Sequence, residues 1–298
     1  MYHSFAEIEK KAHKLKPKPV SVLYPDDPDV MRSIADGFTQ ELIQPILVGN
    51  QSRIEETAEA VGFSQNKFKI IDERDPQKAA DLCVDMAANG EVSFVVKGNI
   101  ITSYLYRSLI RNAKVLKQKQ TTCTLCFHQA KNIGKIFIIT DPGVNIYPDM
   151  ECKRYILENA INTLTRIGYK RPKVMVLSAV SPAISTTASA NEAEELQRLI
   201  DENETLNCEF CNSGNLCAAY FENSIKTEDF PDIFLAPNID TGNILVKTMD
   251  HLGGGIRQCV TVGGGIIMLT PSRSDGYANR MATLSLGVVL SSSQEGTR

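Results

Sequence analysis

The feature that most constrains the fold is a repeated alternation of short apolar runs with longer segments of helical periodicity. The first apolar run, at residues 20–24, leads to Asp27 before a proline, a pairing that caps a helix and fills its first turn. Val30, Ile34 and Phe38 then recur at helical spacing. Because the same alternation continues along the chain, it predicts an α/β protein whose parallel sheet is covered by helices.

The expected strands are residues 20–24, 45–49, 68–71, 93–96, 135–140, 174–178, 207–211, 232–236 and 265–269. The expected helices are residues 54–61, 76–89, 101–111, 153–167, 191–200 and 278–290, and one more that opens at Gly242-Asn243. Residues 115–127 are β-prone without an intervening helix, which predicts an antiparallel element. A second series of strands and helices begins near Thr140. We therefore expect a first domain of residues 1–140 plus 271–298 and a second domain of residues 141–270.

Composition excludes several classes of protein. The 298 residues are 43% hydrophobic and 22% charged, a balance typical of globular proteins with a sizeable core. A net charge of −3 gives no electrostatic footprint for nucleic acid. No run of eighteen apolar residues is present, and residues 1–7 lack the apolar stretch expected of a secretory leader. We therefore expect a cytoplasmic protein with neither a nucleic-acid nor a membrane partner.

Eight cysteines include two CxxC pairs, Cys123 with Cys126 and Cys208 with Cys211. Zinc favours such pairs when their thiolates converge on one point. The two pairs lie further apart than in a zinc ribbon, and the first falls in an expected strand, where residues three apart point to opposite faces. We favour packing roles for these cysteines and expect no metal site.

Polar residues follow several of the expected strands. Lys97, Gly98 and Thr102 could place an anion at a helix N-terminus, or could simply form a strand-to-helix turn with an exposed lysine. Another group at a strand end comprises Thr140, Asp141 and Asn145. These side chains could form the floor of a pocket or only hold a turn.

Later strand ends carry further candidates. Ser178 could line a cleft at the end of a buried strand, and Gly242, Asn243 and Lys247 follow the strand at residues 232–236. The sharpest local signal is a hydroxyl, a guanidinium and a carboxylate in one loop, Ser272, Arg273 and Asp275. This combination suits a phosphoryl or acyl oxyanion, although a surface turn that caps the last helix would also explain it.

Taken together, the block from Thr140 to Asp149, the block from Gly242 to Lys247 and the Ser-Arg-x-Asp loop resemble the phosphate acetyl/butyryltransferase family. The short chain and the form of that loop are closer to the butyryl branch. The resemblance implies two α/β domains of the isocitrate/isopropylmalate dehydrogenase-like fold with an interdomain cleft. It also implies an enzyme that reversibly transfers a short, butyryl-like acyl group between coenzyme A and inorganic phosphate.

The resemblance also implies roles for individual residues. Arg273 would bind phosphate and stabilise the developing oxyanion, Ser272 would donate a hydrogen bond, and Asp275 would be the base, although the acetyl branch has its aspartate at the position of Asn279. The residues implied in substrate binding are Lys97, Gly98, Thr102, Thr140, Asp141, Asn145, Ser178, Gly242, Asn243 and Lys247. Coenzyme A and phosphate would be substrates, no further cofactor is expected, and a homo-oligomer is implied.

Several departures from the family pattern keep alternatives open. The family's Ser-His falls near Cys123-Thr124, its glutamate falls at Ser181, and one of its carboxylates is lost at Ala219. A non-catalytic or repurposed relative that binds a CoA ester or phosphate is therefore an alternative. A metal- and nicotinamide-dependent dehydrogenase would share the implied fold, but neither clustered aspartates nor a dinucleotide fingerprint supports it.

Overall fold

The computed structural model divides into two compact units. It describes residues 2–63, 68–115, 121–130, 133–178, 187–203, 206–211, 229–272 and 275–292. One unit, called here the terminal unit, comprises Phe5–Thr122 and Gln258–Arg298. The other, called the middle unit, comprises Cys123–Arg257 with Met1–Ser4.

The terminal unit is built on a mainly parallel sheet in the order β3-β2-β1-β4-β11-β10. These strands are β1 (Lys18–Leu23), β2 (Ile43–Gly49), β3 (Lys69–Asp72), β4 (Phe94–Lys97), β10 (Ile256–Gly263) and β11 (Ile266–Leu269). β4 pairs in parallel with both β1 and β11, so that Val96 lies between Val22 and Leu269. The carboxyl ends of β4 and β11 therefore lie at the same edge of the sheet.

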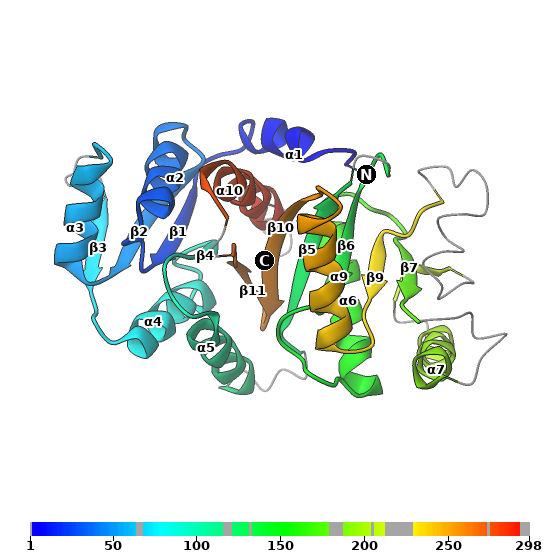
Figure 1. Ribbon diagram of the computed structural model, residues 1–298. Coiled ribbons are helices and arrows are strands. Elements are labelled where there is room, and N and C mark those ends of the chain that lie inside the picture. Colours follow the sequence, from blue (N-terminus) through cyan, green and yellow to red (C-terminus); the bar gives the residue numbers. More distant parts are fainter. Residues whose placement is uncertain are drawn as a thin grey trace. The chain divides into compact units, whose positions relative to one another are not determined.

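Helices cover both faces of this sheet. They are α1 (Phe5–Ala12), α2 (Pro28–Thr39), α3 (Gln51–Ala60), α4 (Pro76–Ala88), α5 (Thr102–Val115) and α10 (Tyr277–Ser292). α4 and α5 pack together on one face, and α10 packs against α1 and α2 on the other (Figure 1). The Asp27 carboxylate accepts hydrogen bonds from the first free amides of α2, as the sequence predicted.

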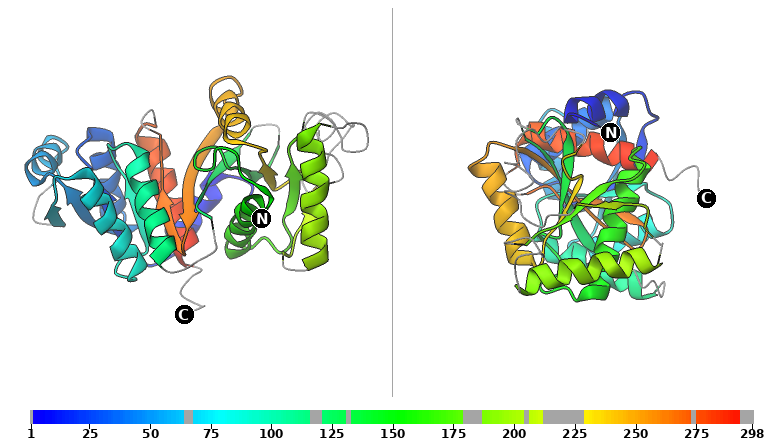
Figure 2. Two further views of the ribbon diagram at one scale, coloured as in Figure 1. Left: turned by 90° about the horizontal axis from the view of Figure 1, so that it is seen from below. Right: turned by 90° about the vertical axis from the view of Figure 1, so that its right-hand side faces the viewer.

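The middle unit contains a second set of strands in the order β5-β6-β9-β7-β8. These are β5 (Cys123–Gln129), β6 (Ile136–Thr140), β7 (Lys173–Val176), β8 (Glu209–Phe210) and β9 (Ile233–Leu235). The helices α6 (Met150–Arg166) and α7 (Ala188–Asn203) lie on one face, and α9 (Ile239–His251) lies on the other (Figure 2). β6, β9 and β7 are parallel, so their carboxyl ends share one edge.

Aliphatic side chains fill the space between the terminal unit's sheet and the α4–α5 pair. Val84, Val95, Leu105, Leu109 and Met268 are almost completely removed from solvent and form one core cluster. Burying each such side chain contributes about 1.5–3 kcal/mol before the entropy of ordering is counted. This core supports the strand ends from which the polar loops emerge.

The middle unit also buries a histidine. The His128 ring is fully buried, and its Nδ1 lies 3.0 Å from the Cys126 carbonyl oxygen. The Asp250 carboxylate is 3.8 Å from Nε2, but Asp250 also pairs with Arg257 at 2.7 Å. Burial lowers the pKa of His128 to about 4, and the nearby Arg257 charge acts in the same direction. His128 is therefore neutral at pH 7.

Most of the predicted strands and helices are present, including the antiparallel element, which is β5 paired with β6. The local structure differs from the prediction in several places, and α1 and β10 are elements that were not predicted. No strand was predicted at β10, because its apolar residues lie between two glycine runs that read as turns. α9 begins at Ile239 rather than at Gly242, because the Asn238 side chain accepts the Thr241 amide and caps the helix earlier.

The boundaries between the terminal unit and the middle unit differ from the expected domain limits at residues 140 and 271. The segment from Cys123 to Thr140 belongs to the middle unit, because β5 and β6 pair with each other. Residues 258–270 belong to the terminal unit, because β11 pairs with β4. Within the described residues, no helix combines the length and apolar character needed to span a membrane.

Candidate active site

Lys97 ends β4 with its ammonium group inside the protein. Its side chain is only 2% exposed, and Nζ donates to the carbonyl oxygens of Gly98 at 3.3 Å and Pro271 at 3.5 Å. Pro271 directly precedes Ser272, so the lysine contacts the backbone at the start of the predicted catalytic loop. The interpretation of Lys97 as an exposed lysine in a turn was wrong.

Gly98 allows two strand ends to approach closely. A Cβ atom at this position would lie 2.1 Å from the carbonyl oxygen of Tyr24, far inside van der Waals contact. The Gly98 amide also donates to the Leu23 carbonyl oxygen at 2.8 Å. Glycine is therefore required here for backbone packing, and this packing places Lys97.

Two hydrogen bonds join Ser272 to Asp275, and this hydrogen-bonded pair is called here the Ser272–Asp275 turn. The Asp275 amide donates to the Ser272 carbonyl oxygen at 3.1 Å, and the Ser272 amide donates to Asp275 Oδ2 at 2.7 Å. These two bonds fix the direction of the Asp275 carboxylate relative to the Ser272 backbone. Arg273, the predicted phosphate ligand, lies outside the described residues.

A buried arginine that the sequence analysis missed holds both ends of this turn. Arg280, in the first turn of α10, is 6% exposed. Its Nε donates to the Asp275 carbonyl oxygen at 2.9 Å, and its Nη2 donates to the Ser272 carbonyl oxygen at 3.3 Å. The rigid guanidinium fork therefore spans the turn. The sequence did contain a signal for this role. A cation in the first turn of a helix is unfavourable because it opposes the helix dipole, so its presence there indicates another interaction of the side chain.

Asn279, the position of the acetyl branch's aspartate, is tied to the body of the terminal unit. Its Oδ1 accepts a hydrogen bond of 2.7 Å from the amide of Gln258, which is buried. The Thr283 hydroxyl donates to the Asn279 carbonyl oxygen at 2.8 Å and also contacts Gln258. A carboxamide cannot act as a general base, whereas Asp275 supplies a carboxylate at this turn.

Asp141 organises the loop that follows β6 in the middle unit. Its carboxylate accepts hydrogen bonds from the amides of Thr124, Gly143, Val144 and Asn145 at 2.9–3.2 Å, and from the Asn145 side chain at 2.6 Å. Burial raises the pKa of Asp141, and the hydrogen bonds from Asn145 and its neighbours oppose that shift. These donors make the carboxylate hold the loop in place.

The start of α9 lies against the same loop. The Asn243 side chain donates to the Pro142 carbonyl oxygen at 3.0 Å. A Cβ atom on Gly242 would approach the Asp141 carbonyl oxygen to 3.0 Å. The structure therefore brings together two groups that the sequence predicted separately, the loop from Thr140 to Asn145 and the Gly242-Asn243 pair.

Cys123 lies beneath this loop as a buried thiol. The Asn159 amide is 3.6 Å from its sulfur. Burial raises the pKa of Cys123 well above its ordinary value, and the nearby Asp141 charge adds to the shift. The thiol is therefore protonated and unreactive at neutral pH. Cys126 is also buried, and no cluster of potential metal ligands is found in the part of the chain that the structure describes.

The remaining predicted residues have different surroundings. Thr102 is the first residue of α5 and is half-buried. Ser178 follows β7, is half-buried and lines a cavity in the middle unit. Lys247 is exposed on α9. Ser181 and Ala219, two of the departures from the family pattern, lie outside the described residues.

Comparison with known proteins gives a family for this fold and these loops. The family model described as phosphate acetyl/butaryl transferase matches residues 77–268, more than half of the chain. That segment contains Lys97, the loop from Thr140 to Asn145 and the Gly242-Asn243 pair. It ends just before Ser272.

Individual relatives extend the match. A phosphate butyryltransferase of Clostridium acetobutylicum is 26% identical over 97% of this chain and 99% of its own length. A branched-chain phosphotransacylase of Enterococcus faecalis has a similar structure, with a TM-score of 0.75 at 22% identity over 92% of this chain and 98% of that one.

A dehydrogenase also has a similar fold. A 4-hydroxythreonine-4-phosphate dehydrogenase of Klebsiella pneumoniae aligns with a TM-score of 0.61 at 14% identity, over 93% of this chain and 98% of that one. The predicted dehydrogenase-like α/β fold is thus confirmed, and the match of the family model to residues 77–268 shows that this chain belongs to the phosphate acetyl/butyryltransferase family.

Proposed function

We propose that this protein is a phosphate acyltransferase that moves a short acyl group between coenzyme A and inorganic phosphate. Family membership supports the reaction class. The observation that carries the assignment of the site is the Ser272–Asp275 turn, whose two carbonyl oxygens are held by Arg280. Beside it, the buried Lys97 ammonium donates to the carbonyl oxygen of Pro271.

In the direction of thioester synthesis, the thiol sulfur of coenzyme A attacks the carbonyl carbon of the acyl phosphate. A bond forms between this carbon and the sulfur. The bond between this carbon and the oxygen that bridges to phosphorus breaks, and inorganic phosphate leaves with that oxygen. The thiol proton must be removed, because the thiolate is by far the better nucleophile. We assign this step to Asp275, whose carboxylate is directed by the Ser272 amide.

Charge that develops on the carbonyl oxygen and on the leaving phosphate needs donors that are already in place. Ser272 supplies a hydroxyl group at the turn, and we assign phosphate binding to Arg273 because of the family resemblance. Lys97 adds positive charge to the same loop from the end of β4. No further cofactor enters this proposal, and coenzyme A and phosphate are substrates.

A second candidate function has one specific observation in its favour. By the family resemblance a serine of the family falls near Cys123, and the Cys123 thiol is buried and has a raised pKa. If that serine is needed for turnover, this chain would bind a CoA ester or phosphate without reacting. Such a relative would show ligand-dependent thermal stabilisation but no product.

The test is release of free thiol from acetyl-, butyryl- and isobutyryl-CoA, with and without phosphate. The proposal requires release that depends on phosphate, and the best substrate would identify the acyl preference. Stabilisation by these thioesters without any release would favour the non-catalytic relative. We also propose that the protein is cytoplasmic and forms a homo-oligomer. Light scattering after size-exclusion chromatography tests the oligomeric state.

A further inference from the structure

A buried glutamine joins the strand β10 to the helix that carries Arg280. Gln258, in β10, is only 1% exposed. Its Nε2 donates to Asn279 Oδ1 at 2.7 Å, and its Oε1 accepts a hydrogen bond from the Thr283 hydroxyl. Asn279 and Thr283 lie four residues apart on α10, so they share one face of the helix. The glutamine amide therefore clamps two successive turns of α10.

A hydrogen bond on the opposite side holds the start of the same helix. The Tyr277 hydroxyl donates to Asp36 Oδ2, in α2, at 2.7 Å. Because an α-helix turns by about 100° per residue, the side chains of Tyr277 and Asn279 leave α10 in directions about 160° apart. The first turn is thus held from two sides, and it cannot rotate about the helix axis without breaking one of these hydrogen bonds.

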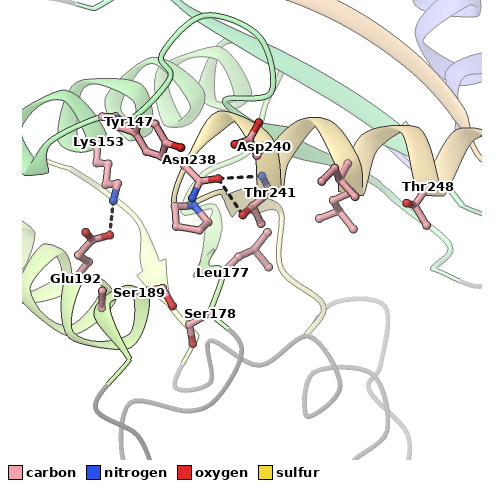
Figure 3. A pocket seen from close by; sticks show the side chains of 15 residues that line it. Tyr147, Lys153, Leu177, Ser178, Ser189, Glu192, Asn238, Asp240, Thr241 and Thr248 are labelled. Atoms are coloured by element: carbon pink, nitrogen blue, oxygen red, sulfur yellow. Dashed lines mark hydrogen bonds and ion pairs between the residues drawn. The ribbon is translucent and has the colours of Figure 1, made fainter.

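These long-range hydrogen bonds differ from the local cap at the start of α9. There the Asn238 side chain accepts hydrogen bonds from the amide and the hydroxyl of Thr241, three residues further along the chain (Figure 3). A local cap moves with its own helix, so it cannot set how that helix is rotated within the unit. Gln258 and Asp36 belong to other elements of the terminal unit, so their hydrogen bonds do set the rotation of α10.

The rotation of α10 decides where the guanidinium of Arg280 points. Arg280 directly follows Asn279. Its Nε donates to the Asp275 carbonyl oxygen at 2.9 Å, and its Nη2 donates to the Ser272 carbonyl oxygen at 3.3 Å. Because the arginine is 6% exposed, packing leaves its side chain little room to adjust. A rotation of the helix would therefore break both bonds to the Ser272–Asp275 turn.

We propose that Gln258 is a positioning residue: through Asn279 it fixes the rotation of α10 and so directs Arg280 at both ends of the Ser272–Asp275 turn. A buried amide is costly unless its hydrogen bonds are made, and a buried polar network that is satisfied specifies one arrangement. A methionine could fill the same space, but α10 would then be held from the Asp36 side alone. The inference rests on the proposed function only for its effect on catalysis.

Three variants and a matched control test the clamp. Gln258→Met removes it from the strand, and Asn279→Leu removes it from the half-buried helix position, which keeps the test available if the change at Gln258 prevents folding. Asn279→Asp keeps an acceptor oxygen, and a carboxylate is favourable in the first turn of a helix. The control is Gln77→Met, which removes a glutamine that joins α4 to α5 by donating to the Ser108 hydroxyl at 2.9 Å. Thermal melting identifies the variants that fold.

Initial rates of phosphate-dependent thiol release from butyryl-CoA measure the effect on catalysis. We expect Gln258→Met and Asn279→Leu each to lower kcat about tenfold, the effect of one lost hydrogen bond on the barrier, and to change KM less than about twofold. Asn279→Asp and Gln77→Met should keep the kcat of the wild type. Gln258→Met combined with Arg280→Lys should lower kcat about tenfold, as either change does alone, whereas independent effects would multiply to about a hundredfold.

The Nε–H group of Arg280 reports the same placement without any substrate. In ¹⁵N-labelled protein its resonance is identified by its absence in Arg280→Lys, and its exchange with solvent deuterium is then followed. We expect slow exchange in the wild type, in Asn279→Asp and in Gln77→Met. Exchange should be at least about tenfold faster in Gln258→Met and Asn279→Leu, because their first turn of α10 is less tightly held.

The inference is overturned if exchange of the Arg280 Nε–H is unchanged in both Gln258→Met and Asn279→Leu. A loss of kcat in Gln77→Met as large as that in Gln258→Met would also overturn it, and so would a loss of about a hundredfold in the double variant. The proposed function fails separately. A wild type that releases no thiol refutes the reaction, while the exchange rates still decide whether Gln258 places Arg280.

Discussion

Arg280 gives the most demanding prediction, because one side chain is assigned to hold both ends of the turn that we propose to be catalytic. Its two hydrogen bonds, of 2.9 and 3.3 Å, are made by a charged donor to the Asp275 and Ser272 carbonyl oxygens. Hydrogen bonds to charged groups contribute about 1.5–3 kcal/mol each. In Arg280→Lys the charge remains, but a single ammonium cannot reproduce the fork and span both carbonyl oxygens.

We therefore expect Arg280→Lys to lose about one of these bonds, or about 1.5 kcal/mol. If this lost free energy had stabilised the geometry of the turn in the transition state, kcat falls about tenfold. The KM for butyryl-CoA then changes little. Arg280→Met removes both bonds and should lower kcat at least about a hundredfold. Initial rates of phosphate-dependent thiol release, measured over a range of both substrates, give these values.

The control is Arg198→Lys, which alters an exposed arginine that pairs with Glu202 one turn away on α7. Such surface pairs contribute little, so its kcat and melting temperature should match the wild type. Added guanidinium at concentrations too low to denature the protein should restore part of the activity of Arg280→Met. An Arg280→Lys enzyme with wild-type kcat would refute the assignment of Arg280 to the turn.

Three further predictions test other parts of the structure. Gly98→Ala should destabilise the protein by about 3 kcal/mol in urea unfolding, because the new methyl group would meet the Tyr24 carbonyl oxygen. Asp275→Asn should lower kcat at least about a hundredfold with little change in KM, and a kcat close to that of the wild type would exclude Asp275 as the base. Because burial lowers the pKa of His128 from 6.5 to about 4, its neutral form stabilises the fold fully above pH 6.5. That contribution, about 3 kcal/mol, should be lost as the pH falls towards 4. The corresponding loss should be absent in His128→Asn.

The alternation of strands and helices could be predicted from the sequence because it depends on local patterns. Caps such as Asp27 and apolar runs such as residues 20–24 carry their information within a few residues. β10 could not be predicted in this way. Its glycine neighbours read as turns, and only its pairing with β11 makes it a strand.

The candidate site was predictable where residues lie close in sequence. Ser272 and Asp275 were found together, but Arg280 was missed because its contacts depend on how α10 starts. For Asp141 the sequence left a pocket floor and a turn equally open. In the structure its carboxylate holds the turn through hydrogen bonds that reach back to Thr124, seventeen residues earlier. Contacts of this kind are set by the pairing of β5 with β6.

The measurement that tests the central claim most directly is phosphorus NMR of butyryl-CoA incubated with the protein and inorganic phosphate. The account predicts a new acyl phosphate resonance that grows in a one-to-one ratio with released coenzyme A and disappears when coenzyme A is added in excess. Release of coenzyme A with no acyl phosphate would indicate hydrolysis, and no release at all would indicate a binding protein. Either result would contradict the assignment of this chain as a phosphate acyltransferase.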